Sequence, residues 1–400
     1  MEIVFYSNFI NHHQKLLADC LSQLTEGHFT FVGTRPMPDS FRSSGYADYS
    51  GLGYVLNAWQ SEENKAEARR LAVEADVALF GGWSTEYAVL RARRTDKLSF
   101  EISERWLKKG LLNLLSPRLL ENQWHYRTLW RRKPFYKLCA SAFGAADQYR
   151  LHSYRGRCYK WGYFTRVEPL DIASVPPAEG PLRMMWCSRF IDWKHPELPV
   201  LLAERLKSKG YDFVIDMYGS GGLLICTKAL AEIRGVDDVV FFHGNMPNDA
   251  ILSQMRAHQV FLFTSDCNEG WGAVANEAMA SGCLLVGSDA IGAMPFLVED
   301  GVSGMLFSSA ASNTGFRRRG LVIDAAALDS LTSRVESILA DPQCMGRMAS
   351  VAYDTISTVW SPDNAARNLM TLIDFLLTGE GTVPAEGPCS IALANISNKK

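Results

Sequence analysis

The stretch NEGWGAVANEAMASG, residues 268–282, follows an apolar run at 260–264 that predicts a buried β-strand. It places Glu269 in the loop after that strand and Glu277, eight residues later, inside the helix that the Ala-rich segment predicts. Ligands of open α/β sheets bind at the carboxyl edge of the strands. The stretch therefore predicts a strand, a loop and a helix, with two carboxylates placed to meet a ligand.

The other residues of this loop suit a ligand that comes close to the backbone. Gly270 and Gly272 flank Trp271, and glycine leaves room for a ligand against the main chain. From Ala273 onward, the free amides of the helix start can hold oxygens of a sugar or a phosphate. These four residues are predicted to contribute to binding.

Working outward, apolar runs and helical segments alternate along most of the chain. Such alternation predicts parallel sheets covered by helices on both faces. The length of 400 residues favours two domains over one. The expected strands lie at 2–6, 29–32, 54–56, 77–80 and 98–102, then at 182–186, 213–218, 239–242, 260–264 and 283–286.

A Pro/Gly-rich stretch at 175–181 predicts the linker between the domains. We expect an N-terminal Rossmann-like domain over 1–175 and a C-terminal one over 182–360. A helix at 361–378 is expected to cross back to the N-terminal domain. The remainder, 379–400, has the composition of a flexible tail.

Composition excludes several classes of protein. The formal net charge of -2 does not favour a nucleic-acid partner. The nine cysteines show neither a C-x-x-C pair nor zinc-ligand spacing, and no D-x-D motif stands out, so neither a metal nor a cofactor is expected. The N-terminus lacks the features of an export signal, and no apolar run approaches the ~20 residues of a membrane span, which predicts a cytoplasmic protein.

The motif at 268–282 resembles glycosyltransferase family 4 of the GT-B fold, whose signature is E-x7-E before an Ala/Met-rich helix. The resemblance implies two Rossmann-like domains facing across a cleft and a nucleotide-sugar donor held mainly by the C-terminal domain. It also implies that Glu269 lies against the donor sugar and that Glu277 accepts hydrogen bonds from the ribose.

A second match is CSRFIDWK at 187–194, after the first strand of the C-terminal domain. Family members carry an Arg and a Lys here that contact the donor diphosphate, which makes Arg189 and Lys194 the corresponding residues. Two fixed cations can stabilise the charge that grows on a departing diphosphate without a metal.

Two further loops follow strands of this domain and complete the expected donor site. Gly219 lies in a Gly-rich loop after the second strand, and the loop at 243–246 follows the third. In the family the latter loop lies beside the nucleotide base, so Asn245 and Met246 are candidates for that contact.

The N-terminal half is similar to bacterial transferases that build surface polysaccharides, through N-x-H-Q at 11–14 and S-E-R at 103–105. Asn11, His13 and Glu104 are therefore candidates for the acceptor side. The alternative for the paired histidines at 12 and 13 is a helix cap or a solvated turn.

Residues 104–137 carry nine Lys or Arg against two Glu, interleaved with aromatic residues. This composition suits a surface that meets anionic lipid or a lipid-linked acceptor at the inner face of the cell membrane. A solvated helical insertion is the alternative.

The resemblance implies a retaining glycosyltransferase of bacterial O-antigen, capsule or exopolysaccharide synthesis, and the absence of a metal motif predicts that it is metal-independent. Its partners would be a nucleotide-diphosphate-sugar and a glycan or lipid-linked glycan. A nucleotide-sugar epimerase and a non-catalytic binding partner remain as alternatives. The sugar, the base and the acceptor stay open.

Overall fold

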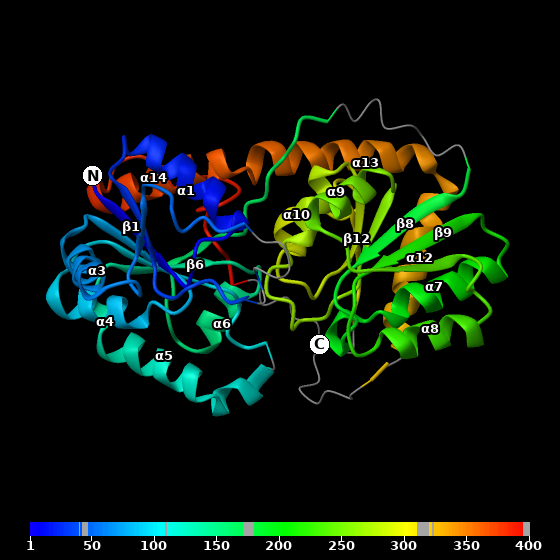
Figure 1. Ribbon diagram of the computed structural model, residues 1–400, viewed down its shortest axis with the longest axis horizontal. Coiled ribbons are helices and arrows are strands. Elements are labelled where there is room, and N and C mark those ends of the chain that lie inside the picture. Colours follow the sequence, from blue (N-terminus) through cyan, green and yellow to red (C-terminus); the bar gives the residue numbers. More distant parts are fainter. Residues whose placement is uncertain are drawn as a thin grey trace. The chain divides into compact units, whose positions relative to one another are not determined.

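The computed structural model describes residues 1–39, 41, 47–108, 110–170, 180–309, 320–321 and 324–394. The chain divides into two compact units, which are described separately. The first unit comprises Met1–Leu107, Leu112–Arg166 and Val359–Lys400, and the second Lys108–Leu111 and Val167–Thr358. Each unit contains one parallel β-sheet with flanking helices (Figure 1). The predicted pair of α/β domains is confirmed.

The first unit has a seven-stranded parallel sheet in the order β3-β2-β1-β4-β5-β6-β7. Its strands are β1 (Ile3–Ser7), β2 (Phe29–Gly33), β3 (Val55–Asn57), β4 (Val77–Phe80), β5 (Ser99–Ser103), β6 (Phe135–Cys139) and β7 (Cys158–Lys160). Its helices are α1 (His12–Leu24), α3 (Glu62–Glu74), α4 (Thr85–Arg94), α5 (Pro117–Thr128), α6 (Gly144–Arg150) and α14 (Pro362–Thr378), with short turns η1 (Gly110–Leu115) and η2 (Trp130–Arg132).

The strands predicted for this half are present to within two residues, but β6 and β7 were not predicted. The central residue of β6 is Lys137, which is fully buried and donates to Oε1 of Glu101 on β5 at 2.7 Å and to Oγ of Ser103 at 2.6 Å. A buried lysine is tolerated because its charge is paired. A pattern of apolar residues does not predict a strand with a lysine at its centre, because the carboxylate that pairs with the lysine lies on another strand.

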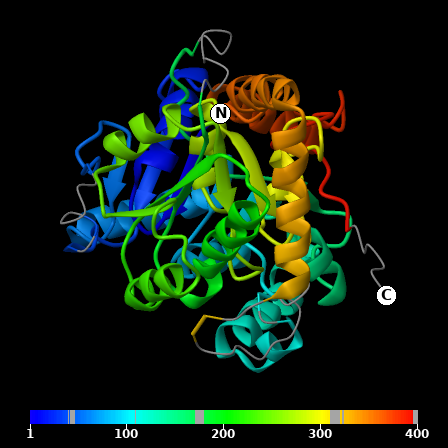
Figure 2. The ribbon, with the colours of Figure 1, turned by 90° about the vertical axis from the view of Figure 1, so that its right-hand side faces the viewer.

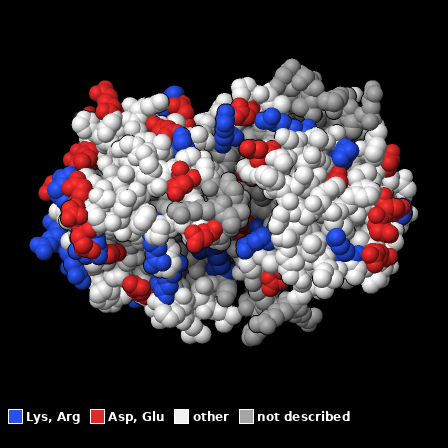
Figure 3. Space-filling view, viewed as in Figure 1, with Lys and Arg blue, Asp and Glu red and all other residues white. Residues whose placement is uncertain are grey.

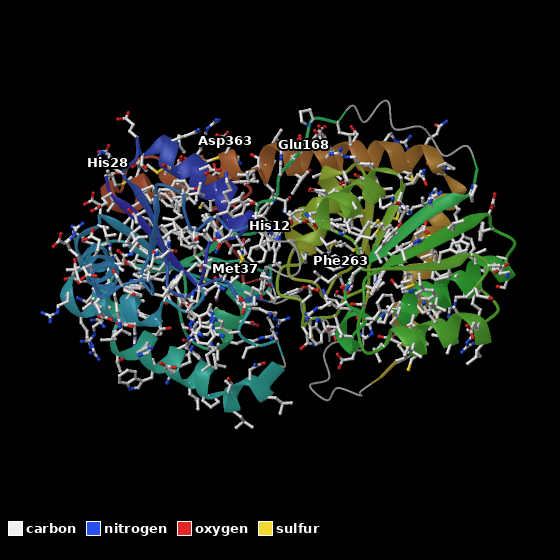
Figure 4. The ribbon with its side chains drawn as sticks, viewed as in Figure 1. His12, His28, Met37, Glu168, Phe263 and Asp363 are labelled. Carbon is white, nitrogen blue, oxygen red and sulfur yellow. The ribbon has the colours of Figure 1, made fainter. Side chains whose placement is uncertain are left out.

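The predicted C-terminal helix is present as α14, and it belongs to the first unit. It packs against α1, beside which it lies in Figure 1. Oγ of Ser361 accepts the amide of Asn364 at 3.2 Å and caps the helix, while Asp363 lies in its first turn (Figure 4). The helix ends at Gly379, whose φ of +75° suits glycine.

The prediction of a flexible tail over 379–400 is wrong for the part that pairs with β7. The amide of Cys389 donates to the carbonyl of Lys160 at 2.7 Å, and that of Lys160 to Ser390 at 2.8 Å. The amide of Ala392 donates to Cys158 at 3.0 Å. These bonds satisfy the outer edge of β7, which would otherwise be open. Residues 395–400 lie outside the described residues.

The second unit has a six-stranded parallel sheet in the order β10-β9-β8-β11-β12-β13. The strands are β8 (Leu182–Cys187), β9 (Phe213–Tyr218), β10 (Val240–Gly244), β11 (Val260–Phe263), β12 (Leu284–Ser288) and β13 (Met305–Phe307). The helices are α7 (Glu197–Ser208), α8 (Leu224–Ile233), α9 (Asn248–Arg256), α10 (Val274–Ala280), α11 (Met294–Leu297), α12 (Ala325–Ala340) and α13 (Pro342–Asp354). The 3-10 helix η4 (Asp192–Lys194) also lies in this unit, and the π-helix η6 (Thr355–Val359) ends at the first residue of the C-terminal part of the first unit.

The core of this unit is formed by the apolar inner strands and the helices on the two faces of the sheet. Met184, Ile215, Leu262 and Val286 are fully buried on the strands. Helix α12 packs against α7 and against β13, and Figure 2 shows it in orange along one side of the sheet. Most of the predicted linker at 175–181 lies outside the described residues.

Candidate active site

The order of the strands in the second unit identifies the edge where a ligand can bind. From β8 the chain proceeds through β9 to β10 on one side, whereas β11, β12 and β13 follow on the other. The carboxyl ends of β8 and β11 therefore flank the topological switch point, where open α/β sheets bind ligands. The loop at 188–195 follows β8 and the loop at 264–273 follows β11, so both contribute to this point.

Lys194 and Glu269 are brought together at this point. The amine of Lys194 forms an ion pair with Oε2 of Glu269, and both side chains are largely buried. The loops that carry them are also joined by the backbone, because the hydroxyl of Thr264 donates to the carbonyl of Lys194 at 2.7 Å. The indole of Trp186 in turn donates to Oγ of Thr264 at 2.8 Å. A predicted cation and a predicted carboxylate thus form one site.

Arg189, the other predicted cation, is exposed at the end of β8. Its guanidinium carbon lies 5.4 Å from the ring centroid of Trp193, a cation–π arrangement. Its charge is therefore held near the Lys194 loop and remains accessible to an anionic ligand.

Glu277 is the second acid of the predicted pair and lies on α10. Burial raises its pKa to about 7, and a hydrogen bond with the Asn248 side chain opposes this effect only partly. Near neutral pH the carboxyl is poised between its two protonation states. Burial likewise raises the pKa of Cys187 to about 12, with the charge of Glu277 adding to the effect and that of Lys194 opposing it.

Gly219 joins three of the loops at this edge. Its φ is +123°, and a Cβ atom there would lie 1.9 Å from the carbonyl oxygen of Ser188. Its amide donates to the carbonyl of Gly244 at 2.8 Å. Beyond it, Asn245 donates to Oγ of Ser220 at 2.9 Å, and both Asn245 and Met246 are exposed. The predicted loops therefore lie together, with two accessible side chains.

The loop after β11 shows which of its residues are available to a ligand. Gly272 has a φ of +88°, and a Cβ atom there would lie 2.4 Å from the ring of Phe263, the last residue of β11 (Figure 4). Gly270 is buried, and Ala273 is the half-buried residue that precedes α10.

Trp271 needs a correction as a binding residue. Its side chain is fully buried, and its indole donates to Oδ1 of Asn276 at 2.8 Å. The side chain is therefore a core element that shapes the loop, and no part of Trp271 is exposed in this structure.

In the first unit, the structure links two of the three acceptor-side candidates. The hydroxyl of Tyr163 donates to Oε1 of Glu104 at 2.9 Å, and the Tyr163 ring stacks on His13 with 6.0 Å between ring centroids. Burial, with a smaller contribution from His12, lowers the pKa of His13 to about 3, so its imidazole is neutral at ordinary pH. Sequence reasoning missed Tyr163, which carries no motif.

Asn11 has a different role. Its Oδ1 accepts the amides of His13 at 3.0 Å and Gln14 at 3.2 Å, so it caps the start of α1. The cap that was considered for the paired histidines is therefore made by the preceding asparagine. A contact between the Asn11 side chain and the acceptor substrate would compete with the hydrogen bonds of this cap.

Two findings concern metals and charge. Among the described residues, no group of three or more His, Cys, Asp or Glu could hold a metal ion. On the face drawn in Figure 3, basic and acidic side chains are interspersed.

In the part of the chain that the structure describes, no helix is both long and apolar enough to cross a membrane.

The second unit matches a known family. Residues 168–354, a little under half of the chain, fit the family model described as glycosyl transferases group 1. The match lies within the second unit and does not extend into the first.

The curated relatives include the D-inositol 3-phosphate glycosyltransferase of Streptomyces griseus, which is 35% identical over 101 residues, 25% of this chain and 21% of the relative. The GtfA subunit of the UDP-N-acetylglucosamine–peptide N-acetylglucosaminyltransferase of Streptococcus pneumoniae is 27% identical over 133 residues, 33% of this chain and 26% of that protein. The matches thus span about a fifth to a quarter of these relatives.

Solved structures share the fold over nearly the whole chain. Anabaena Alr3699/HepE in complex with UDP has a TM-score of 0.63 at 16% identity, covering 92% of this chain and 98% of that one. The sucrose-phosphate synthase of Thermosynechococcus elongatus has a TM-score of 0.65 at 14% identity, covering 95% and 100%. At these identities the likeness establishes the GT-B type of fold.

Proposed function

We propose that the chain is a retaining glycosyltransferase of family 4 that moves a sugar from a nucleotide-diphosphate-sugar to a hydroxyl of a glycan or lipid-linked glycan. The observation that supports this most directly is the contact between Lys194 and Glu269 at the switch point of a group 1 domain. It provides a cation for a leaving diphosphate beside a carboxylate for the reacting sugar.

The donor would contact the loops at the carboxyl edge of the second sheet. Arg189 and Lys194 would bind the diphosphate, Glu269 the sugar and Glu277 the ribose. The base would lie beside Asn245 and Met246, both of which are exposed. We propose a uridine nucleotide as the first donor to test, because the names of two relatives contain UDP.

In the proposed reaction the acceptor oxygen attacks the anomeric carbon on the face from which the diphosphate leaves. The bond between the anomeric carbon and the phosphate oxygen breaks, and the diphosphate takes the proton of the acceptor hydroxyl. Retention then needs no nucleophile from the protein. Arg189 and Lys194 stabilise the charge on the leaving group, so we propose turnover without a metal.

The acceptor side would involve the first unit. We propose that His13 and Glu104, which Tyr163 links, orient a hydroxyl of the acceptor. The neutral imidazole of His13 is suited to hydrogen bonding with a sugar hydroxyl. A role in bacterial surface polysaccharide synthesis is part of this proposal.

We also propose that the stretch 104–137 meets anionic lipid at the inner face of the cell membrane. Its exposed apolar residues include Leu115 at 79%, Leu120 at 58% and Trp124 at 54%. Between residues 112 and 132 the chain carries four arginines against one glutamate. Each basic residue near an anionic membrane contributes about 1 kcal/mol, and the apolar side chains can enter the interface.

The test is a thermal-shift screen against UDP, GDP, ADP and CMP, because a ligand that binds only the folded state raises the melting temperature. We expect one nucleoside diphosphate to stabilise the wild type, and both Arg189→Ala and Glu277→Ala to abolish the shift. Arg256→Ala and Glu232→Ala, which change exposed residues of the same unit, are the controls and should keep it.

Product analysis then separates the classes of enzyme. Transfer requires an acceptor, whereas an isomerised sugar from the donor alone would indicate an epimerase. Nucleotide binding without turnover of any donor would indicate a binding partner. A loss of activity in EDTA that manganese restores would contradict metal-independent turnover.

A further inference from the structure

The residue that follows Lys194 has a backbone conformation that calls for an explanation. His195 has φ +47° and ψ +58°, the left-handed region. A residue with a Cβ atom is strained in this region, whereas glycine adopts it freely. Whether the side chain of His195 has a role is decided by what it contacts, because other non-glycine residues of the chain, such as His152, also have a positive φ.

The imidazole of His195 lies between two carboxylates. Its Nδ1 is 2.7 Å from Oε1 of Glu197, and its Nε2 is 3.5 Å from Oδ2 of Asp266. The Glu197 side chain is almost completely buried. Burial alone would lower the pKa of His195, but the interactions of the ring with the carboxylates of Asp266 and Glu197, which accept from it, outweigh burial and raise the pKa to about 10. A ring held between two carboxylates can carry a proton on each nitrogen, with Nδ1 donating to Glu197 and Nε2 facing Asp266.

Asp266 connects this ring to the loop that carries Glu269. Its Oδ1 accepts both the amide and the side-chain nitrogen of Asn268 at 2.8 Å, and its carbonyl accepts the amide of Glu269 at 3.0 Å. Its own amide donates to the carbonyl of Trp193 at 3.0 Å. One carboxylate oxygen thus shapes the Glu269 loop while the other faces His195.

We propose that His195 is a positioning residue: it bridges Glu197 at the start of α7 and Asp266 after β11, and so holds Lys194 and Glu269 in their relative positions. This inference rests on the proposed function, in which those two residues act on the donor. His195 itself contacts neither donor nor acceptor in this scheme.

The charges around the site explain why a protonated ring is needed. Two cations, Lys194 and His195, face three carboxylates, Glu197, Asp266 and Glu269. Without the imidazolium, the carboxylates of Glu197 and Asp266 would lose the cation between them. Asp266 would then compete with Glu269 for the Lys194 amine, and the amine would be less available to the leaving diphosphate.

The first test replaces His195 with glycine, which suits the backbone and removes the bridge. We expect kcat to fall about 100-fold, since a displacement of about 1 Å in a reacting group can have that effect. The KM for the donor should change little, and free imidazole should restore part of kcat. A kcat within about twofold of wild type would show that His195 is only a turn residue and would overturn the proposal.

His152→Gly is the matched control, because His152 is also a left-handed histidine, with φ +54°, and it is exposed in the first unit. It should leave kcat unchanged. Asp266→Asn is the second variant; if the glycine variant does not fold, a kcat of Asp266→Asn within about twofold of wild type would by itself overturn the proposal. By itself, Asp266→Asn should lower kcat. Combined with His195→Gly, it should cause no further loss of kcat, as expected for two residues that act through one interaction. If the losses of kcat in the two single variants added up in the double variant, the bridge between His195 and Asp266 would be contradicted.

Histidine NMR distinguishes a failure of this inference from a failure of the proposed function. In the wild type, the ring signal of His195, assigned by its loss in His195→Gly, should remain that of an imidazolium up to about pH 9. A neutral ring at pH 7 would overturn the bridge whatever the enzyme does. A charged ring in a protein that binds no nucleotide would instead reject the proposed function.

Discussion

The amine of Lys194 contacts the carboxylate of Glu269, although 75 positions separate the two residues in the chain. The ends of two neighbouring strands, β8 and β11, bring them together. We expect Lys194→Ala and Glu269→Gln each to lower kcat by about 100-fold, the effect of removing one charge-stabilising group from an active site. Steady-state kinetics with the donor found in the nucleotide screen would measure it.

A second lysine–glutamate pair in the same unit provides the control. Lys209 and Glu336 form an exposed ion pair, and such pairs contribute little. Lys209→Ala and Glu336→Gln should therefore keep wild-type kcat. If the variants of both pairs lost kcat equally, the effect would come from lower stability, and Lys194 and Glu269 would have no part in the reaction.

Donor binding should depend on pH through Glu277. Its pKa in the folded protein is about 7, above the ordinary 4.5, so its ionisation costs folding free energy that appears as pH rises between these values. A ribose hydroxyl donates best to the ionised carboxylate. The thermal shift given by the nucleotide should therefore grow between about pH 6 and about pH 8 in the wild type.

Glu277→Gln provides the comparison, because glutamine keeps the shape and cannot ionise. The rise in melting temperature that the nucleotide gives with this variant should be smaller than in the wild type and should not change over the same pH range. A wild-type shift that falls as pH rises would mean that the protonated form of Glu277 binds the ribose.

Gly219 should be intolerant of any side chain. An alanine there would combine a left-handed φ with a Cβ atom 1.9 Å from the carbonyl of Ser188. We expect Gly219→Ala to lower the free energy of unfolding by about 2 kcal/mol or more and to abolish the nucleotide shift. Denaturant unfolding measures the first effect.

Gly222→Ala is the control in the same loop. No atom lies within 4 Å of a Cβ atom at Gly222, and its φ is outside the left-handed region. This variant should unfold like the wild type. Equal destabilisation by both changes would argue against the close approach of the loops that follow β8 and β9.

Removing the C-terminal segment should destabilise the first unit. Residues 389–392 pair with the edge of β7, and Asn368 on α14 donates to the carbonyl of Pro388 at 3.0 Å. A chain that ends at Gly379 should melt at a lower temperature and aggregate through the uncovered strand. A chain that ends at Ala394 keeps these contacts and should melt like the full chain, as calorimetry would show.

Membrane contact should depend on the apolar residues of α5. We expect the wild type to sediment with vesicles that contain phosphatidylglycerol, less so at high salt, and little with pure phosphatidylcholine. Leu120→Glu with Trp124→Glu should abolish this binding. Ile225→Glu with Ile233→Glu, at exposed positions of α8, should not. Equal binding to both kinds of vesicle would contradict an electrostatic contact.

Much of the fold could be predicted from the sequence because it depends on local pattern. The apolar runs at 77–80 and 213–218 are strands with those bounds, and the helix expected at 361–378 is α14 (Pro362–Thr378). Helix and strand periodicities act over a few residues, so they are readable along the chain. The spacing of Glu269 and Glu277 likewise placed one acid in a loop and the other on a helix.

Tertiary structure decided which of the candidate residues meet. The pairing of Lys194 with Glu269, the bridge through His195 and the link from His13 to Glu104 through Tyr163 all join distant segments. The burial of Trp271 and the pairing of the C-terminal segment with β7 also could not be predicted from the local sequence pattern. These contacts depend on the register of neighbouring strands and on close packing, which no single stretch of sequence contains.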